Sequence, residues 1–294
     1  MPMPTPLPNV DTKACGLLSS TPSIGFFLRD TRKSLQLFPA YFKITKPALE
    51  AIILPLQSQS HKKPAGRARC VLETHLAEPK RKRLAVFVSG GGSNFKSIHH
   101  ACREGLINGD IIAVVTSNSE CGGAQYARKE GIPVFLFPKS RKEPMGASPS
   151  GLVSSMRSLE IDFIFLAGYL KLLPLELIES FPRAILNIHP SLLPSFGGKG
   201  FFGMNVHKAV IASGARYSGA TIHFVDENFD TGRTLAQRVV PVLDTDTAED
   251  LAARVLKEEH RLYVEVAVAL CEDRVYWRDD GVPFIKHSHY ITSN

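Results

Sequence analysis

The sequence is poor in cysteine and in long apolar runs. Its five cysteines are Cys15, Cys70, Cys102, Cys121 and Cys271. They form no C-x-x-C pair and show no histidine spacing typical of a zinc site. An odd, scattered set of this kind suits a reducing compartment, so we predict neither a disulfide nor a structural metal. No apolar stretch reaches the roughly 18 residues that span a bilayer, so no transmembrane helix and no membrane partner are expected.

The sequence also has no excess of basic residues after residue 83. The whole chain has a net charge of +7, but residues 1–83 hold 14 of its 35 Lys and Arg and only 5 of its 28 Asp and Glu. Residues 84–294 therefore hold 21 basic and 23 acidic residues, a net charge of −2. This part shows no basic stripe with interleaved aromatic residues, so the charge predicts no nucleic-acid partner.

Residues 1–73 are predicted to be a leader that is removed from a mature domain at residues 74–294. The leader is rich in proline at residues 1–8, carries Ser and Thr at residues 18–23 and is short of acids. This composition is typical of an organellar transit peptide, and the scarcity of Arg near the start favours the chloroplast over the mitochondrion. A disordered extension is the alternative. Cleavage is expected between about residues 65 and 74, and the basic run at residues 80–83 is interpreted as the junction, although it could pass for a nuclear signal.

Apolar runs and helical spacing alternate along the mature domain. Strands are predicted at residues 84–88, 111–115, 134–137, 163–166, 184–189, 219–225 and 233–242, with a short β extension at 275–285. Helices are predicted at residues 95–103, 123–130, 150–159, 174–180 and 207–212, and one opens at Thr247-Ala-Glu-Asp250, which resembles a capping box. The alternation predicts an α/β fold with a single doubly wound, mostly parallel sheet, right-handed crossovers and helices on both faces.

Glycines follow the first predicted strand in Ser89-Gly-Gly-Gly-Ser-Asn94 and lead into a helix. Free backbone N–H groups and the helix dipole make such a turn a phosphate site, although a tight turn packed on the sheet would also need glycine. The Gly-Lys-Ser/Thr of a P-loop is missing, and Phe95 stands where a dinucleotide fingerprint has its third glycine. The second strand ends without the acid that holds a ribose of NAD, which disfavours a dinucleotide-dependent oxidoreductase.

The predicted strand from residue 184 delivers two polar side chains at its end. Asn187 and His189 lie two residues apart and share one face, while Ile188 points toward the core and Pro190 prevents the strand from continuing. An amide donor beside an imidazole suits acyl transfer, in which an oxyanion must be held and a proton moved. By itself an Asn-x-His pair also fits two polar groups that merely satisfy hydrogen bonds at a strand end.

Other segments are expected around the same cleft, because ligands bind beyond the carboxyl ends of parallel strands. Residues 89–94, 168–173 and 187–194 all lie at such ends. Residues 195–203 are glycine-rich and are predicted to be a mobile loop over the site. From the residues alone, Asp230 is a turn residue and Glu259 lies on a solvated helix face.

Five motifs together resemble one enzyme family. They are Ser89-Gly-Gly-Gly-Ser-Asn94, Leu166-Ala-Gly-Tyr-Leu-Lys-Leu-Leu173, Asn187-Ile-His-Pro-Ser-Leu-Leu-Pro194, His223-Phe-Val-Asp-Glu-Asn-Phe-Asp230 and Ala253-Arg-Val-Leu-Lys-Glu-Glu-His260. In this order they resemble the phosphoribosylglycinamide formyltransferases of purine synthesis, of a plant, plastid-targeted type. The resemblance covers about residues 83–276. Lys171 stands where many bacterial members have Arg, and residues 195–203 are longer and richer in glycine than their loop.

The resemblance implies a role for specific residues. Asn187, His189 and Asp230 become the catalytic trio, and Gly92, Ser93 and Asn94 hold the substrate phosphate. Glu259 contacts the glycinamide substrate. The folate is framed by Leu170, Lys171, Leu172 and Leu173, together with Asn187.

The implied reaction transfers the formyl group of 10-formyltetrahydrofolate, a co-substrate, to the amine of 5′-phosphoribosylglycinamide through a tetrahedral intermediate. Asn187 and His189 would stabilise the oxyanion, and Asp230 would polarise the imidazole or a water beside it; no metal is needed. Small molecules are the expected partners of a monomer or homodimer. Formyltetrahydrofolate hydrolase and methionyl-tRNA formyltransferase share the trio, but the regulatory module of the first and the tRNA-binding barrel of the second are not evident in this sequence.

Overall fold

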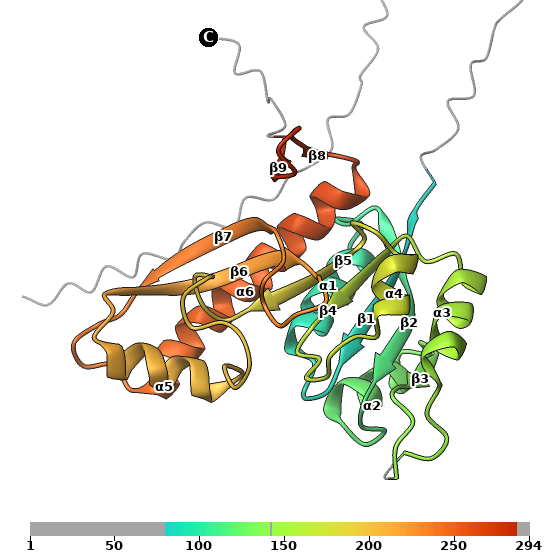
Figure 1. The fold of residues 1–294 in the computed structure, drawn as a ribbon, viewed down its shortest axis with the longest axis horizontal. Coiled ribbons are helices and arrows are strands. Elements are labelled where there is room, and N and C mark those ends of the chain that lie inside the picture. The colour runs from blue at the N-terminus through green and yellow to red at the C-terminus, as the bar shows by residue number, and fades with distance from the viewer. Residues whose placement is uncertain (1–79, 142, 287–294) are drawn as a thin grey trace, which may run out of the picture. The chain divides into compact units, whose positions relative to one another are not determined.

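Seven strands form the central sheet of the computed structural model (Figure 1). They are β1 (Lys82–Val88), β2 (Gly109–Thr116), β3 (Val134–Leu136), β4 (Phe163–Leu166), β5 (Ile185–His189), β6 (Tyr217–Phe224) and β7 (Thr234–Pro241). Their order is β3-β2-β1-β4-β5-β6-β7. Strands β1 to β5 pair in parallel, whereas β6 pairs antiparallel with both β5 and β7. The predicted doubly wound, mostly parallel sheet is therefore confirmed.

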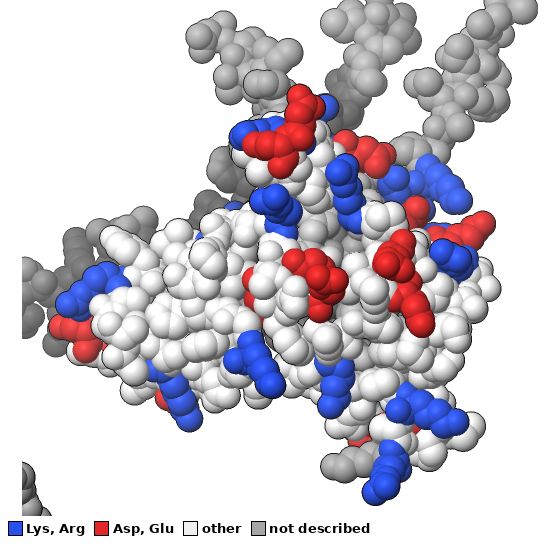
Figure 2. Space-filling view, viewed as in Figure 1, with Lys and Arg blue, Asp and Glu red and all other residues white. Residues whose placement is uncertain are grey.

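The structure describes residues 80–141 and 143–286, which belong to one compact unit, Glu73–Asn294. The predicted leader at residues 1–73 and its cleavage region lie outside the described residues. Within the described part, none of the helices is long and apolar enough to cross a membrane. On the face drawn in Figure 2, basic and acidic side chains are interspersed.

Six helices among the described residues cover the two faces of the sheet. They are α1 (Ser93–Arg103), α2 (Gly122–Lys129), α3 (Pro149–Ser158), α4 (Leu175–Ser180), α5 (Met204–Ser213) and α6 (Ala248–Cys271). Side chains of α1, α2, α5 and α6 pack with Leu84, Val86 and Val88 in one apolar cluster. Those of α3 and α4 pack with Ala85 and Phe87 in the other. Alternate residues of β1 thus serve opposite faces, which is why its sequence is an uninterrupted apolar run.

Helix α6 crosses the sheet as one long element (Figure 1). The predicted capping box at its start is confirmed, because Thr247 Oγ1 accepts from the Asp250 N–H at 3.1 Å and Asp250 Oδ2 accepts from the Thr247 N–H at 3.0 Å. Further along, the buried Tyr263 hydroxyl lies 3.1 Å from the backbone carbonyl oxygens of both Leu166 and Leu186. These contacts tie α6 to the neighbouring strands β4 and β5 and set the depth of its buried face.

The strand order reverses beside β1, which is the place where doubly wound sheets bind ligands. The chain runs from β1 outward to β2 and β3, then returns to β4 on the other side of β1. The turns after β1 and β4 are joined there, because the Ser89 N–H donates to the Gly168 carbonyl at 3.1 Å and the Leu170 N–H donates to Ser89 Oγ at 3.1 Å. A separate hairpin, β8 (Val275–Trp277) with β9 (Pro283–Ile285), forms the predicted β extension.

Candidate active site

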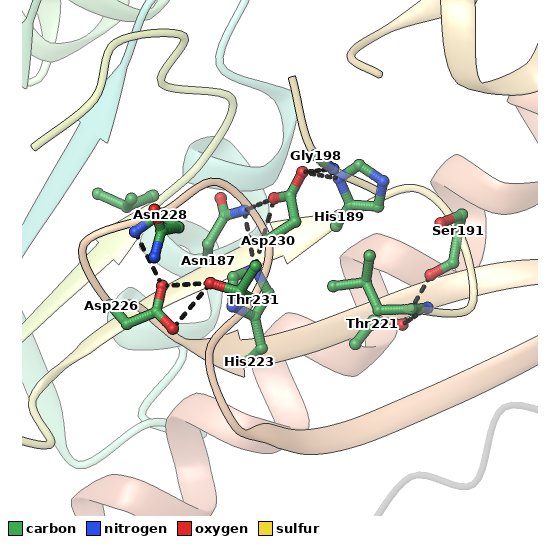
Figure 3. Close-up of polar contacts among 12 residues, drawn as sticks. Asn187, His189, Ser191, Gly198, Thr221, His223, Asp226, Asn228, Asp230 and Thr231 are labelled. Carbon is green, nitrogen blue, oxygen red and sulfur yellow. Dashed lines mark hydrogen bonds and ion pairs between the residues drawn. The ribbon is translucent and has the colours of Figure 1, made fainter. Parts of the chain in front are cut away.

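Strand β5 and the antiparallel strand β6 bring the first polar groups together (Figure 3). Asn187 and His189 alternate with the buried Ile188, as expected for one face of a strand. In the register of this pair, Asn187 lies opposite His223 of β6. Residues directly opposite in antiparallel strands are within side-chain contact, so the pairing itself delivers an imidazole to the Asn187 carboxamide.

Asp230 reaches the same point from the turn between β6 and β7. Its backbone has a φ of 58°, in the left-handed region that aspartate tolerates better than most residues. The prediction that it is a turn residue and the role implied by the resemblance are therefore compatible. Its Oδ2 accepts from the Gly198 N–H at 2.9 Å and lies 3.4 Å from His189 Nδ1, while its Oδ1 lies 3.6 Å from His223 Nε2.

The Asn187 amide nitrogen contacts two of these neighbours. Nδ2 lies 3.1 Å from His223 Nε2 and 3.4 Å from Asp230 Oδ1. A carboxamide has two N–H donors; one points toward Asp230, and the direction of the contact with His223 depends on the tautomer of that ring. The role of Asn187 as a donor to an oxyanion stays a prediction, and it would require a bound substrate to replace one of these two contacts.

The His189 ring is buried between two acceptors. Nε2 lies 2.8 Å from the backbone carbonyl oxygen of Phe196, and Nδ1 faces Asp230. Burial lowers the pKa of His189, while the Asp230 charge and the Phe196 carbonyl oppose that shift. A neutral imidazole can donate to only one of its two neighbours, whereas a protonated ring can donate to both. Burial thus favours the neutral ring, and the two acceptors on either side can receive hydrogen bonds once it takes up a proton.

Asp230 remains ionised despite its surroundings. Burial would raise the pKa of this carboxyl, but the nearby His223 and His189 rings and the Gly198 N–H outweigh burial and hold the pKa below its usual value. A charge of this kind can stabilise an imidazolium that forms beside it.

The glycine-rich segment at residues 195–203, predicted to be a mobile loop, has defined contacts with the trio. The Phe196 carbonyl meets His189 and the Gly198 N–H meets Asp230. The predicted helix at residues 207–212 is longer at its start, since α5 begins at Met204. The loop therefore contributes backbone groups to the site.

A cavity of about 700 Å³ opens onto these residues. It is lined by Asn187, His189, His223 and Asp230, by Leu170, Lys171, Leu172 and Leu173, and by Asn94 and Glu259. Its size lies in the range of small-molecule sites. Leu170 and Leu172 are exposed, at 55% and 51%, whereas Leu173 is buried. Residues that were predicted separately, in three turns and in a distant helix, thus line the same cavity.

The glycine turn after β1 lies beside the N-terminus of α1. Gly92 has a φ of 71°, and a Cβ there would lie 2.9 Å from the Gly123 Cα atom, so glycine is required. No side chain caps α1 at this position, which leaves N–H groups of its first turn free, and Ser93 is exposed. Gly92 and Ser93 do not line the cavity, whereas Asn94 does.

Asn94 and Glu259 form a buried pair at the cavity. Asn94 Nδ2 donates to Glu259 Oε2 at 2.7 Å, and Asn94 Oδ1 is buried without a partner in the described part of the chain. Glu259 is only 8% exposed, so its placement on a solvated helix face was wrong. Burial raises the pKa of Glu259, which the Asn94 bond opposes. An isolated charged residue in a helix gives no sign of this, because its partner is 165 residues away.

The residue-based reasoning missed His223 as a member of the site. It is 2% exposed, and its Nδ1 lies 2.9 Å from the Phe224 carbonyl oxygen. Its strand was predicted, but the antiparallel pairing that sets it opposite Asn187 was not. Among residues 80–141 and 143–286, no cluster of three metal-ligating side chains is found, and Cys102, Cys121 and Cys271 are buried free thiols.

Comparisons with known proteins identify the family of this chain. The family model for formyl transferase matches residues 82–267. The chloroplastic phosphoribosylglycinamide formyltransferase of Vigna unguiculata is 70% identical over 207 residues, which cover 70% of this chain and 66% of the relative. The Arabidopsis thaliana protein of the same name is 58% identical over 236 residues, 80% of each chain. The crystal structure of glycinamide ribonucleotide transformylase 1 from Symbiobacterium toebii superposes with a TM-score of 0.63 at 33% identity, covering 71% of this chain and 95% of that one. The chain belongs to the formyl transferase family and, within it, to the phosphoribosylglycinamide formyltransferases.

Proposed function

We propose that this cavity transfers the formyl group of 10-formyltetrahydrofolate to the glycinamide amine of 5′-phosphoribosylglycinamide. The observation that carries the proposal is the meeting of Asn187, His189 and Asp230 in a cavity that also has an apolar wall and a buried polar pair. The names of the plant relatives support the same reaction and a place in the chloroplast. A monomer or homodimer remains the expected state.

The ribonucleotide binds at the polar part of the lining. Asn94 Oδ1 has no partner in the described part of the chain and Glu259 lies beside it, so ligand hydroxyl or amine groups would satisfy both. The phosphate lies at the start of α1, where Gly92, Ser93 and Asn94 present an uncapped helix end.

The folate binds against the apolar part of the lining. The pterin lies along the backbone of residues 170–173. The Leu170 N–H already donates to Ser89 Oγ, so the polar ring edge is left to Leu172 and Leu173. Lys171 is exposed at the cavity, where its ammonium group complements the carboxylates of a folate glutamate.

In the reaction, the amine attacks the formyl carbon and a C–N bond forms. The bond from that carbon to N10 then breaks, and the proton lost by the amine reaches N10. When the substrates bind, the amine and N10 replace the Phe196 carbonyl oxygen as the neighbours of His189 Nε2. The ring then holds the proton that the amine loses until it passes to N10. Asp230 stabilises the imidazolium from the other side.

The first test uses the full-length chain with 10-formyltetrahydrofolate and follows folate absorbance with and without the ribonucleotide. Deformylation is expected only when 5′-phosphoribosylglycinamide is present, because the amine is the acceptor. Deformylation without it would mean that the trio activates water, as in a hydrolase, and no reaction in either mixture would reject the assigned substrates.

Substitution of the trio tests the assigned chemistry. We expect Asn187→Ala and Asp230→Asn each to lower kcat about 10²- to 10³-fold, the typical effect of removing a preorganised polar group, while both substrates still bind. Asn108→Ala is the matched control, because Asn108 lies in the turn before β2 at the opposite end of the strands. Normal turnover by either trio variant would sink the assignment.

The dependence of kcat on pH tests the role of His189. Burial lowers the pKa of this ring, so the acidic limb of kcat is expected below the ordinary histidine value of about 6.5. Below its pKa the ring already carries a proton and cannot accept the one that leaves the amine. The Asp230 charge raises the pKa of His189. Removing that charge in Asp230→Asn should lower this pKa, so the acidic limb of the residual activity should lie at still lower pH. A limb that moves to higher pH would contradict this role.

Glu259 is tested through ribonucleotide binding. We expect Glu259→Gln to raise the KM for the ribonucleotide about 10- to 100-fold, because a hydrogen bond to a charged group contributes about 1.5–3 kcal/mol. The KM for folate should stay the same. Glu258→Gln is the control, since the neighbouring Glu258 pairs with Arg238 and Arg261 and does not line the cavity. An unchanged ribonucleotide KM would remove Glu259 from the site.

A further inference from the structure

The cavity gathers a large share of the exposed apolar side chains. Among the described residues, 14 large apolar side chains are exposed, and six of them line the cavity. Large apolar groups that meet solvent in one place mark a binding surface. The folate contacts proposed above use two of the six and leave the other four without a role. The six are Leu170, Leu172, Phe202, Met204, Phe229 and Leu256.

Phe202 lies in the glycine-rich loop at residues 195–203. The neighbouring Phe201 is half-buried against the core and meets the Phe196 ring edge-on, with ring centroids 6.4 Å apart. Phe202, by contrast, is 51% exposed and lines the cavity. Of these two consecutive aromatic residues, Phe201 therefore anchors the loop, whereas Phe202 is available to a ligand.

Lys199 is held at the corner of a turn in the same loop. The Gly198 carbonyl accepts from the Phe201 N–H at 3.1 Å, and Gly200 has a φ of 95° at the third position of this turn. A positive φ at that position is what a type II turn requires, and glycine adopts it without strain. Lys199 occupies the second position, where its side chain is exposed at the cavity.

The charges of the lining favour a ligand with carboxylates. The basic residues of the lining are Lys171, in the turn after β4, and Lys199, in the glycine-rich loop. Each of the three acidic residues of the lining already accepts a hydrogen bond from the chain; these residues are Asp226, Asp230 and Glu259. A ligand with two carboxylates, such as a glutamate, is complementary to a pair of ammonium groups on two different segments.

The proposed reaction determines where the middle of the folate lies. N10 joins the pterin to the aminobenzoyl ring, and it must lie beside His189. The glycine-rich loop starts at the same point, because the Phe196 carbonyl oxygen lies 2.8 Å from His189 Nε2 and the Gly198 N–H donates to Asp230 at 2.9 Å. With the pterin on the turn after β4, the aminobenzoyl ring must extend from His189 along this loop.

We propose that the glycine-rich loop recognises the aminobenzoyl-glutamate part of the folate, with the Phe202 ring packed against the aminobenzoyl ring and the Lys199 ammonium group paired with one glutamate carboxylate. This inference rests on the proposed function and extends it to a part of the co-substrate that does not react. Packing of the two rings removes apolar surface from water and allows an offset or edge-to-face aromatic contact. The ion pair is exposed to solvent, so its contribution is smaller.

The contact with Phe202 is tested by calorimetric binding of tetrahydrofolate, the folate product of the reaction, to the full-length chain. We expect Phe202→Ala to raise the Kd about tenfold, because the ring contact is lost. Phe202→Tyr keeps an aromatic ring and should stay within about twofold of the wild-type Kd. Tyr217→Ala is the matched control, since Tyr217 is 64% exposed at the start of β6 and does not line the cavity.

The contact with Lys199 is tested with tetrahydropteroate, which lacks the glutamate. We expect Lys199→Gln to raise the Kd of tetrahydrofolate about threefold at low salt, as for an exposed ion pair, and to leave the Kd of tetrahydropteroate unchanged. The threefold effect should shrink as salt is added. Phe202→Ala should weaken both ligands alike. Lys208→Gln is the control, because Lys208 is exposed on α5 and does not line the cavity.

An unchanged tetrahydrofolate Kd in Phe202→Ala would overturn the proposal, as would an equal effect of Lys199→Gln on the two ligands. Both side chains are exposed, so neither change removes core packing. Failure of the proposed function gives a different result. A wild-type chain that binds tetrahydrofolate but does not formylate the ribonucleotide would reject the reaction, while the binding measurements still decide the contacts of the loop.

Discussion

The site depends on one buried carboxylate and the donors that surround it. Asp230 lies on a turn, yet its side chain is largely enclosed, and a charge removed from water must be hydrogen-bonded or paired. Its partners come from separate parts of the chain: the Gly198 N–H from a loop and the Asn187 amide from β5. Because all of these groups contact the same carboxylate, Asp230 fixes the positions of the loop, the amide and the neighbouring His189 ring relative to one another.

The topology of the sheet brings the groups around Asp230 together. Parallel strands β1, β4 and β5 end at one edge, and the reversal of strand order beside β1 opens space for a ligand there. The change to antiparallel pairing at β6 then sets His223 opposite Asn187. A shift of one residue in this register would turn His223 to the other face of the sheet. The register therefore determines the position of His223 as well as which residues face the core.

The lining of the cavity is completed by α6, which lies near the far end of the chain. Tyr263 ties this helix to the carbonyl groups of β4 and β5, and Glu259 lies about one turn earlier. The same tie that stabilises the packed face therefore sets the depth at which Glu259 meets Asn94. A helix that was free to slide along the sheet could not hold a buried acid beside a single amide partner.

Local features of the sequence predicted the elements well. The apolar run of β1, the glycine turn before α1 and the capping box of α6 each act over a few residues, so their physics is visible in the sequence. The motifs that resemble the formyltransferases also predicted that Asn187, His189 and Asp230 act together, and the structure brings these three side chains close to one another. Only the tertiary structure decided that Glu259 is buried and that His223 belongs to the site. Those properties depend on partners 165 and 36 residues away, and a local pattern has no means of recording the strand pairing and packing that bring them together.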